Sequence, residues 1–239
     1  MLYGTRRITL TGMPTVLLIR HGRTAANASG TLAGRTPGVH LDDKGREQCG
    51  DLARRIADVP LAAAVVSPLE RTQETASLIL AGRSVPVHLD ERVAECRYGD
   101  WTGQSLKVLA KDPLWKVVQS HPSAVTFPGD DAESMIDMQH RAVTAVRAWN
   151  STMSADAIYA VVSHGDVIKA ILADALGMHL DQFQRIHVDP ASVSIVEYTN
   201  TRPFVQRTND TSGDLSHLAS KRAKKTRSSD AAVGGGAGR

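Results

Sequence analysis

Two histidines, each followed by glycine where an apolar run ends, are the residues of this chain best suited to chemistry. His21 follows Arg20 and the apolar run 16–19, and His164 follows the run 158–163. Short runs rich in β-branched residues are typical of buried strands. Open α/β sheets bind their ligands where such strands end. A neutral imidazole at that place is a competent nucleophile.

Two arginines are predicted to lie near the same strand ends. Arg20 directly precedes His21, and Arg71 lies in the first turn of a helix that follows the strand predicted over 63–66. A guanidinium group binds phosphate oxygens through two parallel, charge-assisted hydrogen bonds, and a helix N-terminus also favours anions. Taken alone, Arg71 fits an ordinary surface position. Together with the two histidines, the arginines predict a site for a phosphoryl group.

Glu95 precedes a loop that contains Gly99, Trp101 and Gly103. A carboxyl group at such a place can give a proton to a leaving oxygen and later take one from water. The alternative is a solvated loop carboxylate, which is the usual state of a glutamate. The neighbouring Cys96 is a less favoured nucleophile, because a buried free thiol is inert and the residues around it do not form a nucleophile loop.

At these residues the chain resembles the histidine phosphatase superfamily, whose fold is shared with phosphoglycerate mutases. Four segments match in the family's order, and the resemblance extends over residues 13–198. The four segments are Arg20-His21-Gly22 with Thr24 and Asn27, then Ser67-Pro68-Leu69-Glu70-Arg71-Thr72, then Glu95 with 99–103, and then Ser163-His164-Gly165. The resemblance is to the phosphatase branch of the superfamily.

The resemblance implies a phosphomonoesterase of the histidine acid phosphatase type, acting on a small phosphorylated metabolite through a phosphohistidine at His21. Glu95 is the implied proton donor, and a carboxyl group beside a phosphate dianion favours activity at acidic pH. No metal or cofactor is implied, since the other histidines lack ligand spacing. The implied catalytic residues are His21, Glu95, Arg20, Arg71 and His164. The implied phosphate-binding residues are Arg20, Gly22, Asn27, Arg71, His164 and Gly165.

The motifs alone leave phosphatase and mutase open. Mutases of this family usually carry an acidic residue where this chain has Arg23, and a tryptophan in the loop that here reads 24–27. Both departures, together with a compact stretch over 101–130, favour hydrolysis. Mutase-type transfer within a sugar acid is the alternative, and a non-catalytic phosphate-binding protein is less favoured. Arg23 fits either a second anionic group on the substrate or a solvent-facing position.

The alternation of strands and helices predicts an α/β fold, phosphoglycerate mutase-like, with a mostly parallel central sheet and helices on both faces. A chain of 239 residues is long enough for one such domain. The segments expected to select the substrate are 35–41 and 103–133. Strands are expected over 16–19, 63–66, 85–89, 158–163 and 193–197, and helices over 45–56, 71–80, 135–149 and 167–176.

The charge of the chain is concentrated near its C-terminus. Residues 200–239 hold eight Lys or Arg and three Asp, so the net charge of +3 leaves the remainder slightly acidic. We expect an N-terminal extension over 1–12, a histidine phosphatase domain over 13–205 and a basic, disordered tail over 206–239. A solvated tail is favoured over one that binds nucleic acid. No transmembrane run is found, and two cysteines without framework spacing fit a reducing cytoplasm. A homodimer is compatible with the resemblance.

Overall fold

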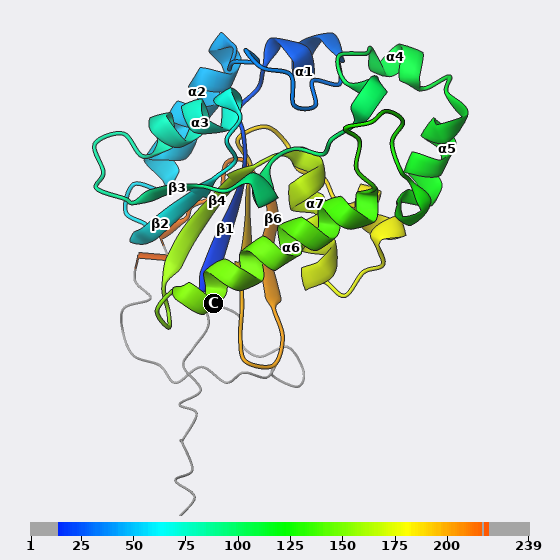
Figure 1. Cartoon of the computed structure of the whole chain (residues 1–239). Helices are drawn as coiled ribbons and strands as arrows, with labels where there is room; N and C mark the ends of the chain where they lie inside the picture. Colours follow the sequence, from blue (N-terminus) through cyan, green and yellow to red (C-terminus); the bar gives the residue numbers. More distant parts are fainter. Residues whose placement is uncertain (1–13, 217, 220–239) are drawn as a thin grey trace, which may run out of the picture.

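A six-stranded sheet organises the computed structural model, which describes residues 14–216 and 218–219 (Figure 1). Three strand pairs are parallel and two are antiparallel, so the sheet is mostly parallel as predicted. From one edge to the other the strands are β3 (Val87–Leu89), β2 (Leu61–Val66), β4 (Ile158–Ser163), β1 (Thr15–Arg20), β5 (Val193–Glu197) and β6 (Phe204–Asp210).

The register between β1 and β4 brings the two histidine segments together. These strands are parallel neighbours at the centre of the sheet, and Arg20 lies opposite Ser163. His21 directly follows Arg20, and His164 directly follows Ser163. Parallel neighbours end at the same edge of the sheet, so both histidines leave the sheet side by side.

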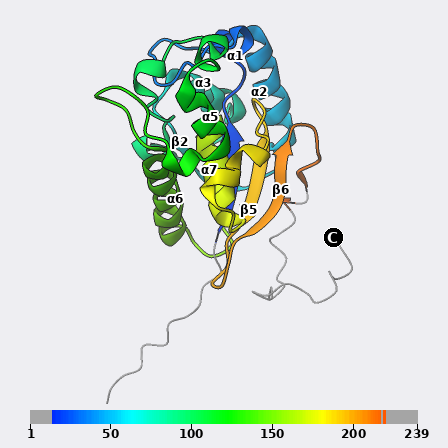
Figure 2. The same ribbon diagram turned by 90° about the vertical axis from the view of Figure 1, so that its right-hand side faces the viewer.

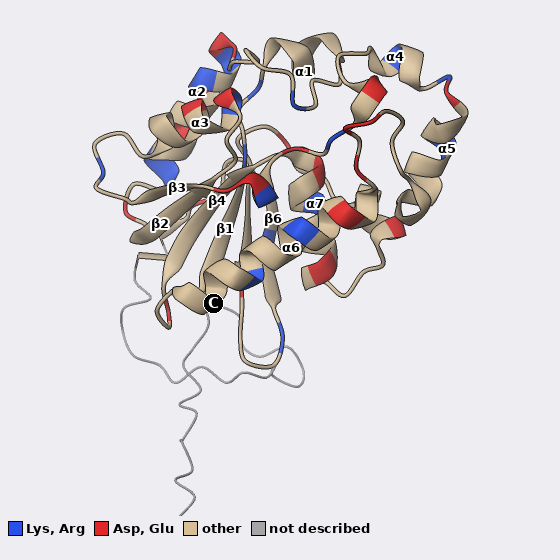
Figure 3. Ribbon diagram, in the orientation of Figure 1, with Lys and Arg blue, Asp and Glu red and all other residues tan. Residues whose placement is uncertain are grey.

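Helices cover both faces of the sheet (Figure 2). The side chains of β1 alternate between the two layers. Leu17 and Ile19 pack with α2 and α3, whereas Val16 and Leu18 pack with α6 and α7. This period of two is what a strand buried on both faces requires. Charged residues gather on helices and loops rather than along the central strands (Figure 3). The four helices are α2 (Asp43–Arg55), α3 (Glu70–Ile79), α6 (Met135–Thr152) and α7 (Gly165–Ala175).

Short elements lie above the carboxyl edge of β1, β2 and β4 and beside α6 and α7, at the top and right of Figure 1. Three of these elements are short α-helices and four are 3₁₀ turns. The helices are α1 (Ala25–Ser29), α4 (Leu106–Leu109) and α5 (Pro113–Ser120), and the turns are η1 (Glu91–Val93), η2 (Gly99–Trp101), η3 (Pro122–Ala124) and η4 (Leu180–Arg185).

The expected strands and helices are present, with ends that differ by a few residues. Strand β6 was not predicted, because its residues are half-buried and form no apolar run. It includes residues 206–210, which the sequence analysis placed in the tail, and Leu215 is fully buried. The domain therefore extends past 205. The expected extension over 1–12, and residues 217 and 220–239 of the expected tail, lie outside the described residues.

Over residues 14–216 and 218–219, no helix combines the length and the apolarity that crossing a bilayer requires.

Candidate active site

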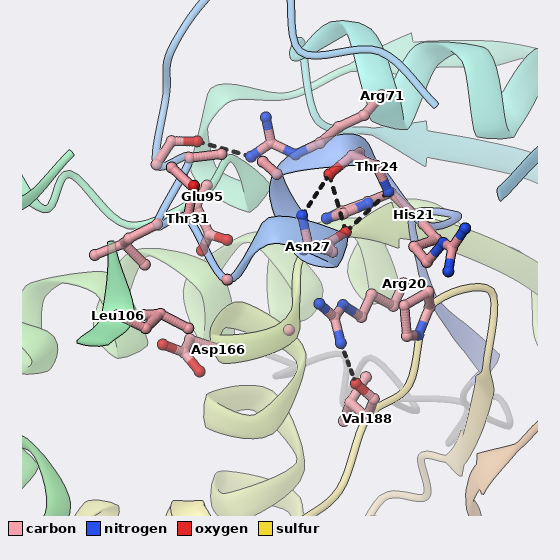
Figure 4. Close-up of a pocket in the computed structure, with 18 of the residues that line it drawn as sticks. Arg20, His21, Thr24, Asn27, Thr31, Arg71, Glu95, Leu106, Asp166 and Val188 are labelled. Atoms are coloured by element: carbon pink, nitrogen blue, oxygen red, sulfur yellow. Dashed lines mark hydrogen bonds between the residues drawn. The ribbon is translucent and has the colours of Figure 1, made fainter. Parts of the chain in front are cut away.

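A cavity of about 490 Å³ opens where β1 and β4 end, and it gathers most of the predicted site residues (Figure 4). His164 is fully buried beside it, with its ring centroid 5.3 Å from that of His21. Of the predicted residues, the cavity is lined by Arg20, His21, Asn27, Arg71, Glu95 and Gly165.

The His21 imidazole is neutral and oriented. Its Nδ1 lies 2.7 Å from the carbonyl oxygen of Gly22. A carbonyl can only accept, so Nδ1 carries the proton and Nε2 keeps its lone pair. Burial, and then the positive charges of Arg71 and Arg20, lower the pKa of His21 well below its usual value. The side chain therefore presents an unprotonated nitrogen at neutral pH.

The contacts of Gly22, a predicted phosphate-binding residue, are those of a packing position. Its N–H donates to Thr75 Oγ1 at 3.0 Å, and Gly22 does not line the cavity. A Cβ atom on Gly22 would lie 2.7 Å from the carbonyl oxygen of Gly45 and 2.8 Å from Cys49 Sγ. Glycine is needed there because the loop that carries His21 packs directly against α2.

Arg20 and Arg71 extend into the cavity from β1 and α3, and both retain unpaired donors (Figure 4). Arg20 donates from Nη1 to the carbonyl of Val188 at 2.7 Å, and Arg71 donates from Nη2 to the carbonyl of Gly34 at 2.7 Å. Among the described residues, Arg20 Nε and Arg71 Nη1 are buried without a partner. A buried unpaired donor is costly, so two such donors at the wall of one cavity are available to an anionic ligand.

Arg71 fixes the tautomer of His164, and Ser67 accepts a hydrogen bond from its remaining proton. The Nδ1 atom of His164 lies 3.2 Å from Arg71 Nη2, which can only donate, so Nδ1 accepts. The proton is then on Nε2, which donates to Ser67 Oγ at 2.7 Å. Burial, followed by the charge of Arg71, keeps the pKa of His164 well below its usual value. Ser67 belongs to one of the four motif segments, but the sequence did not indicate its role.

The surroundings of Glu95 favour the protonated form of its carboxyl group. Its Oε1 accepts from the Cys96 N–H at 2.9 Å, and its Oε2 lies 3.9 Å from His164 Nδ1. Burial and the negative charge of Asp166 raise the pKa of Glu95, and the charge of Arg71 opposes them. A carboxyl group with a raised pKa retains its proton to higher pH and can donate it to a substrate.

Asp166 and Tyr98 are cavity residues that the sequence analysis did not single out. The Tyr98 hydroxyl donates to Asp166 Oδ2 at 2.9 Å and lies 3.4 Å from Glu95 Oε1. Asp166 follows Gly165 at the start of α7, so its position next to a predicted residue was the available signal. The hydroxyl links the two carboxyl groups across the cavity.

The Asp166→Asn variant is expected to shift the pH dependence of catalysis. Removing the negative charge lowers the pKa of Glu95, so the pH above which hydrolysis of an alkyl phosphate declines moves downward. The pH–rate profile of kcat measures this shift. Asp174→Asn removes an equal charge from the same helix, where Asp174 pairs with Arg147 near the surface, and serves as the control. An equal shift in both variants would contradict the assignment.

A buried ion pair fixes the segment that carries Glu95. Arg141 on α6 donates to the carbonyls of Arg92 and Ala94, each at 2.8 Å, and of Glu95 at 3.1 Å. Arg141 also donates to the carboxylate of Glu133, at 2.6 and 2.9 Å. That carboxylate accepts a further hydrogen bond from the backbone N–H of Arg97. Three carbonyls on one guanidinium group hold the loop backbone in a single arrangement.

The Arg141→Met variant is expected to lower the free energy of unfolding by about 3–5 kcal/mol, because it leaves the carboxylate of Glu133 buried without its partner. Chemical denaturation measures the change. Arg147→Met, on the same helix, removes an exposed ion pair with Asp174 and is expected to cost less than about 1 kcal/mol. Equal losses in the two variants would show that Arg141 has no special part in holding the loop.

Of the remaining predicted residues, some line the cavity and others do not. Asn27 closes the capping box of α1, where its Oδ1 accepts from the N–H and the hydroxyl of Thr24, and this leaves its amide group to offer hydrogen bonds at the cavity wall. His40 contacts Glu74 and does not line the cavity. Residues 30–34 line it, whereas the predicted selecting segment 35–41 does not.

Cys96 is a poor nucleophile in this fold. It is fully buried outside the cavity lining, and burial raises the pKa of its thiol well above the usual value. Within the described part of the chain, no three or more His, Cys, Asp or Glu side chains are grouped so that they could hold a metal ion.

The fold and the site define a class of protein. The chain belongs to the histidine phosphatase superfamily (branch 1), whose sequence profile matches residues 16–211. The chain is 28% identical over 206 residues to phosphoserine phosphatase 1 of Hydrogenobacter thermophilus, which covers 83% of this chain and 93% of that protein. It is 29% identical over 210 residues to a probable phosphoglycerate mutase, GpmB, of Erwinia tasmaniensis, with coverage of 86% and 95%.

Among solved structures, YhfR of Bacillus stearothermophilus matches with a TM-score of 0.76 and 29% identity, over 82% of this chain and 97% of that chain. This likeness confirms the predicted phosphoglycerate mutase-like fold. The relatives include both a phosphatase and a mutase by name, so membership in the family establishes the class but not the reaction.

Proposed function

We propose that the protein hydrolyses phosphomonoesters of small metabolites through a phosphohistidine formed on His21. The observation that carries this proposal is the pair of buried, unpaired guanidinium donors of Arg20 and Arg71 around a neutral imidazole. Donors fixed in a buried site favour the charge that spreads over the phosphoryl oxygens in the transition state. Because these donors are already in place, little reorganisation is needed when the substrate binds.

The first chemical step transfers the phosphoryl group to the protein. The lone pair of His21 Nε2 attacks phosphorus while the ester P–O bond breaks, and Glu95 gives its proton to the leaving oxygen. Arg20, Arg71 and the N–H of Gly165 at the start of α7 hold the transferred oxygens. The products are a phosphohistidine, a Glu95 carboxylate and a free alcohol.

The second step returns the protein to its starting state. The Glu95 carboxylate takes a proton from a water molecule as that water attacks phosphorus, and the N–P bond to His21 breaks. Inorganic phosphate leaves, Glu95 is again protonated, and the imidazole lone pair is restored. A mutase would instead return the phosphoryl group to the other hydroxyl of a bound sugar acid, with the same residues.

The sequence favours hydrolysis over mutase transfer at two positions. Arg23 stands where mutases of the family usually carry an acidic residue, and no tryptophan lies in the loop 24–27. In the structure Arg23 donates to Asp42 at 2.9 Å and is 41% exposed. Arg23 lines the cavity, and the ion pair with Asp42 partly neutralises its charge there.

Release of inorganic phosphate tests the proposal. We expect the purified protein to release phosphate from p-nitrophenyl phosphate and from a panel of phosphorylated metabolites, equally with and without a chelator. Interconversion of 2- and 3-phosphoglycerate without phosphate release would establish the mutase alternative. Absence of both reactions, with phosphate analogues still bound, would establish a binding protein that does not catalyse.

A further inference from the structure

One lysine lies on the wall of the cavity, besides Arg20, Arg23 and Arg71. Lys169 on α7 lines the cavity, and its side chain is 19% exposed. Its ammonium group lies 3.1 Å from Gln184 Oε1, 3.4 Å from Asp166 Oδ1 and 5.6 Å from the centre of the Phe183 ring. Groups from α7 and η4 therefore hold this charge in one place at the cavity wall.

We propose that Lys169 binds a carboxylate of the substrate, so that the enzyme selects short phosphomonoesters that carry a carboxylate about one helical turn from the phosphate. The inference rests on the proposed hydrolysis at His21 and adds the chemical class of its substrate. It also gives a task to a residue outside the four motif segments.

The helix α7 carries both Gly165, at the phosphoryl site, and Lys169. Gly165 begins α7, and a Cβ atom there would lie 3.5 Å from the Arg20 guanidinium group. Lys169 is four residues further along the same helix, so it lies on the same face at a rise of about 6 Å. In an extended phosphoester of a three-carbon acid, the phosphate and the carboxylate are separated by a comparable length.

The ammonium group of Lys169 has capacity left for a ligand. An ammonium group has three donors, and its hydrogen bonds in the described structure go to Gln184 and Asp166. The contact with Asp166, at 3.4 Å, is longer than a charge-assisted hydrogen bond of about 2.7–2.9 Å. Asp166 also accepts from Tyr98, so its charge is shared between two partners.

The other candidates for this role fit less well. Arg23 forms an ion pair with Asp42, the residue before α2, and its side chain is more exposed than that of Lys169. Leu32, Ala33 and Leu106 line the cavity with apolar side chains and offer no partner to a charged group. Lys169 is therefore the cation best placed to bind a second anionic group of a substrate held at His21.

Matched substrate pairs test the inference. O-phosphoserine and O-phosphoethanolamine differ by one carboxylate, as do 3-phosphoglycerate and glycerol 3-phosphate. We expect the wild type to favour the carboxylate member of each pair by about tenfold or more in kcat/KM, the effect of one charged hydrogen bond. In Lys169→Met this ratio falls toward one, mainly through KM, and in Lys169→Arg it is largely kept. Lys111→Met, an exposed lysine outside the cavity lining, is the control and keeps the wild-type ratio.

Two results would overturn the inference. A wild type without preference for the carboxylate members excludes a carboxylate site at Lys169. Equal losses for both members of a pair in Lys169→Met would show a structural role only. Hydrolysis of p-nitrophenyl phosphate separates the two proposals. If the wild type hydrolyses this ester but shows no carboxylate preference, only the present inference fails, whereas no hydrolysis of any ester removes the proposed function and this inference with it.

Discussion

Replacing His21 with alanine is expected to lower kcat for phosphate release by about 10⁴-fold or more, the scale seen when a covalent nucleophile is removed. His164, the other histidine at the site, cannot take over. Its ring nitrogens are engaged by Ser67 and Arg71, and it is fully buried. The rate of phosphate release under saturating substrate measures the effect, and circular dichroism confirms that the variant is folded.

Trapping of the phosphorylated protein makes the same prediction more specific. With a substrate labelled in its phosphate, an alkaline quench is expected to recover labelled wild-type protein and no labelled His21→Ala protein. His40→Ala, which removes a histidine outside the cavity lining, is the matched control and is expected to be labelled like the wild type. Label that persists in His21→Ala would place the nucleophile at another residue.

The two histidine segments were predictable because their signals are local. Each is an apolar strand followed by His-Gly, and parallel neighbours in a sheet bring such ends together. The register of Arg20 opposite Ser163 then follows from strand pairing. Strand β6 gave no such signal, since its residues alternate without an apolar run and lie at the sheet edge.

The packing role of Gly22 and the residues missed in the sequence share a physical cause. The partners of Gly22 are Thr75 and the helix α2, which no local pattern connects to it. Ser67 lies 97 residues from His164 in the chain, and Tyr98 lies 68 residues from Asp166. Motif spacing identifies residues that a reaction requires. Hydrogen bonds between distant segments decide which atoms of those residues are free to act.

Glu95→Gln is expected to lower kcat for an alkyl phosphate by about 10²–10⁴-fold, the usual contribution of a general acid or base. The amide cannot protonate the leaving alkoxide. It also cannot take a proton from water in the second step. The nitrophenolate ion leaves without a proton, so with p-nitrophenyl phosphate the first step survives in this variant. A burst of nitrophenol equal to the enzyme concentration is therefore expected before slow turnover, and stopped-flow absorbance measures it.

The pH dependence of the same variant identifies the proton donor. Burial and Asp166 raise the pKa of Glu95, and the protonated form is the donor. For the wild type, the first step with an alkyl phosphate is therefore fast below this raised pKa and declines as pH rises through it. Glu95→Gln has no such group, so the decline disappears from its profile. If the decline persists at the same pH in Glu95→Gln, the donor is another group, and Asp166 and Tyr98 are the nearest that the cavity offers.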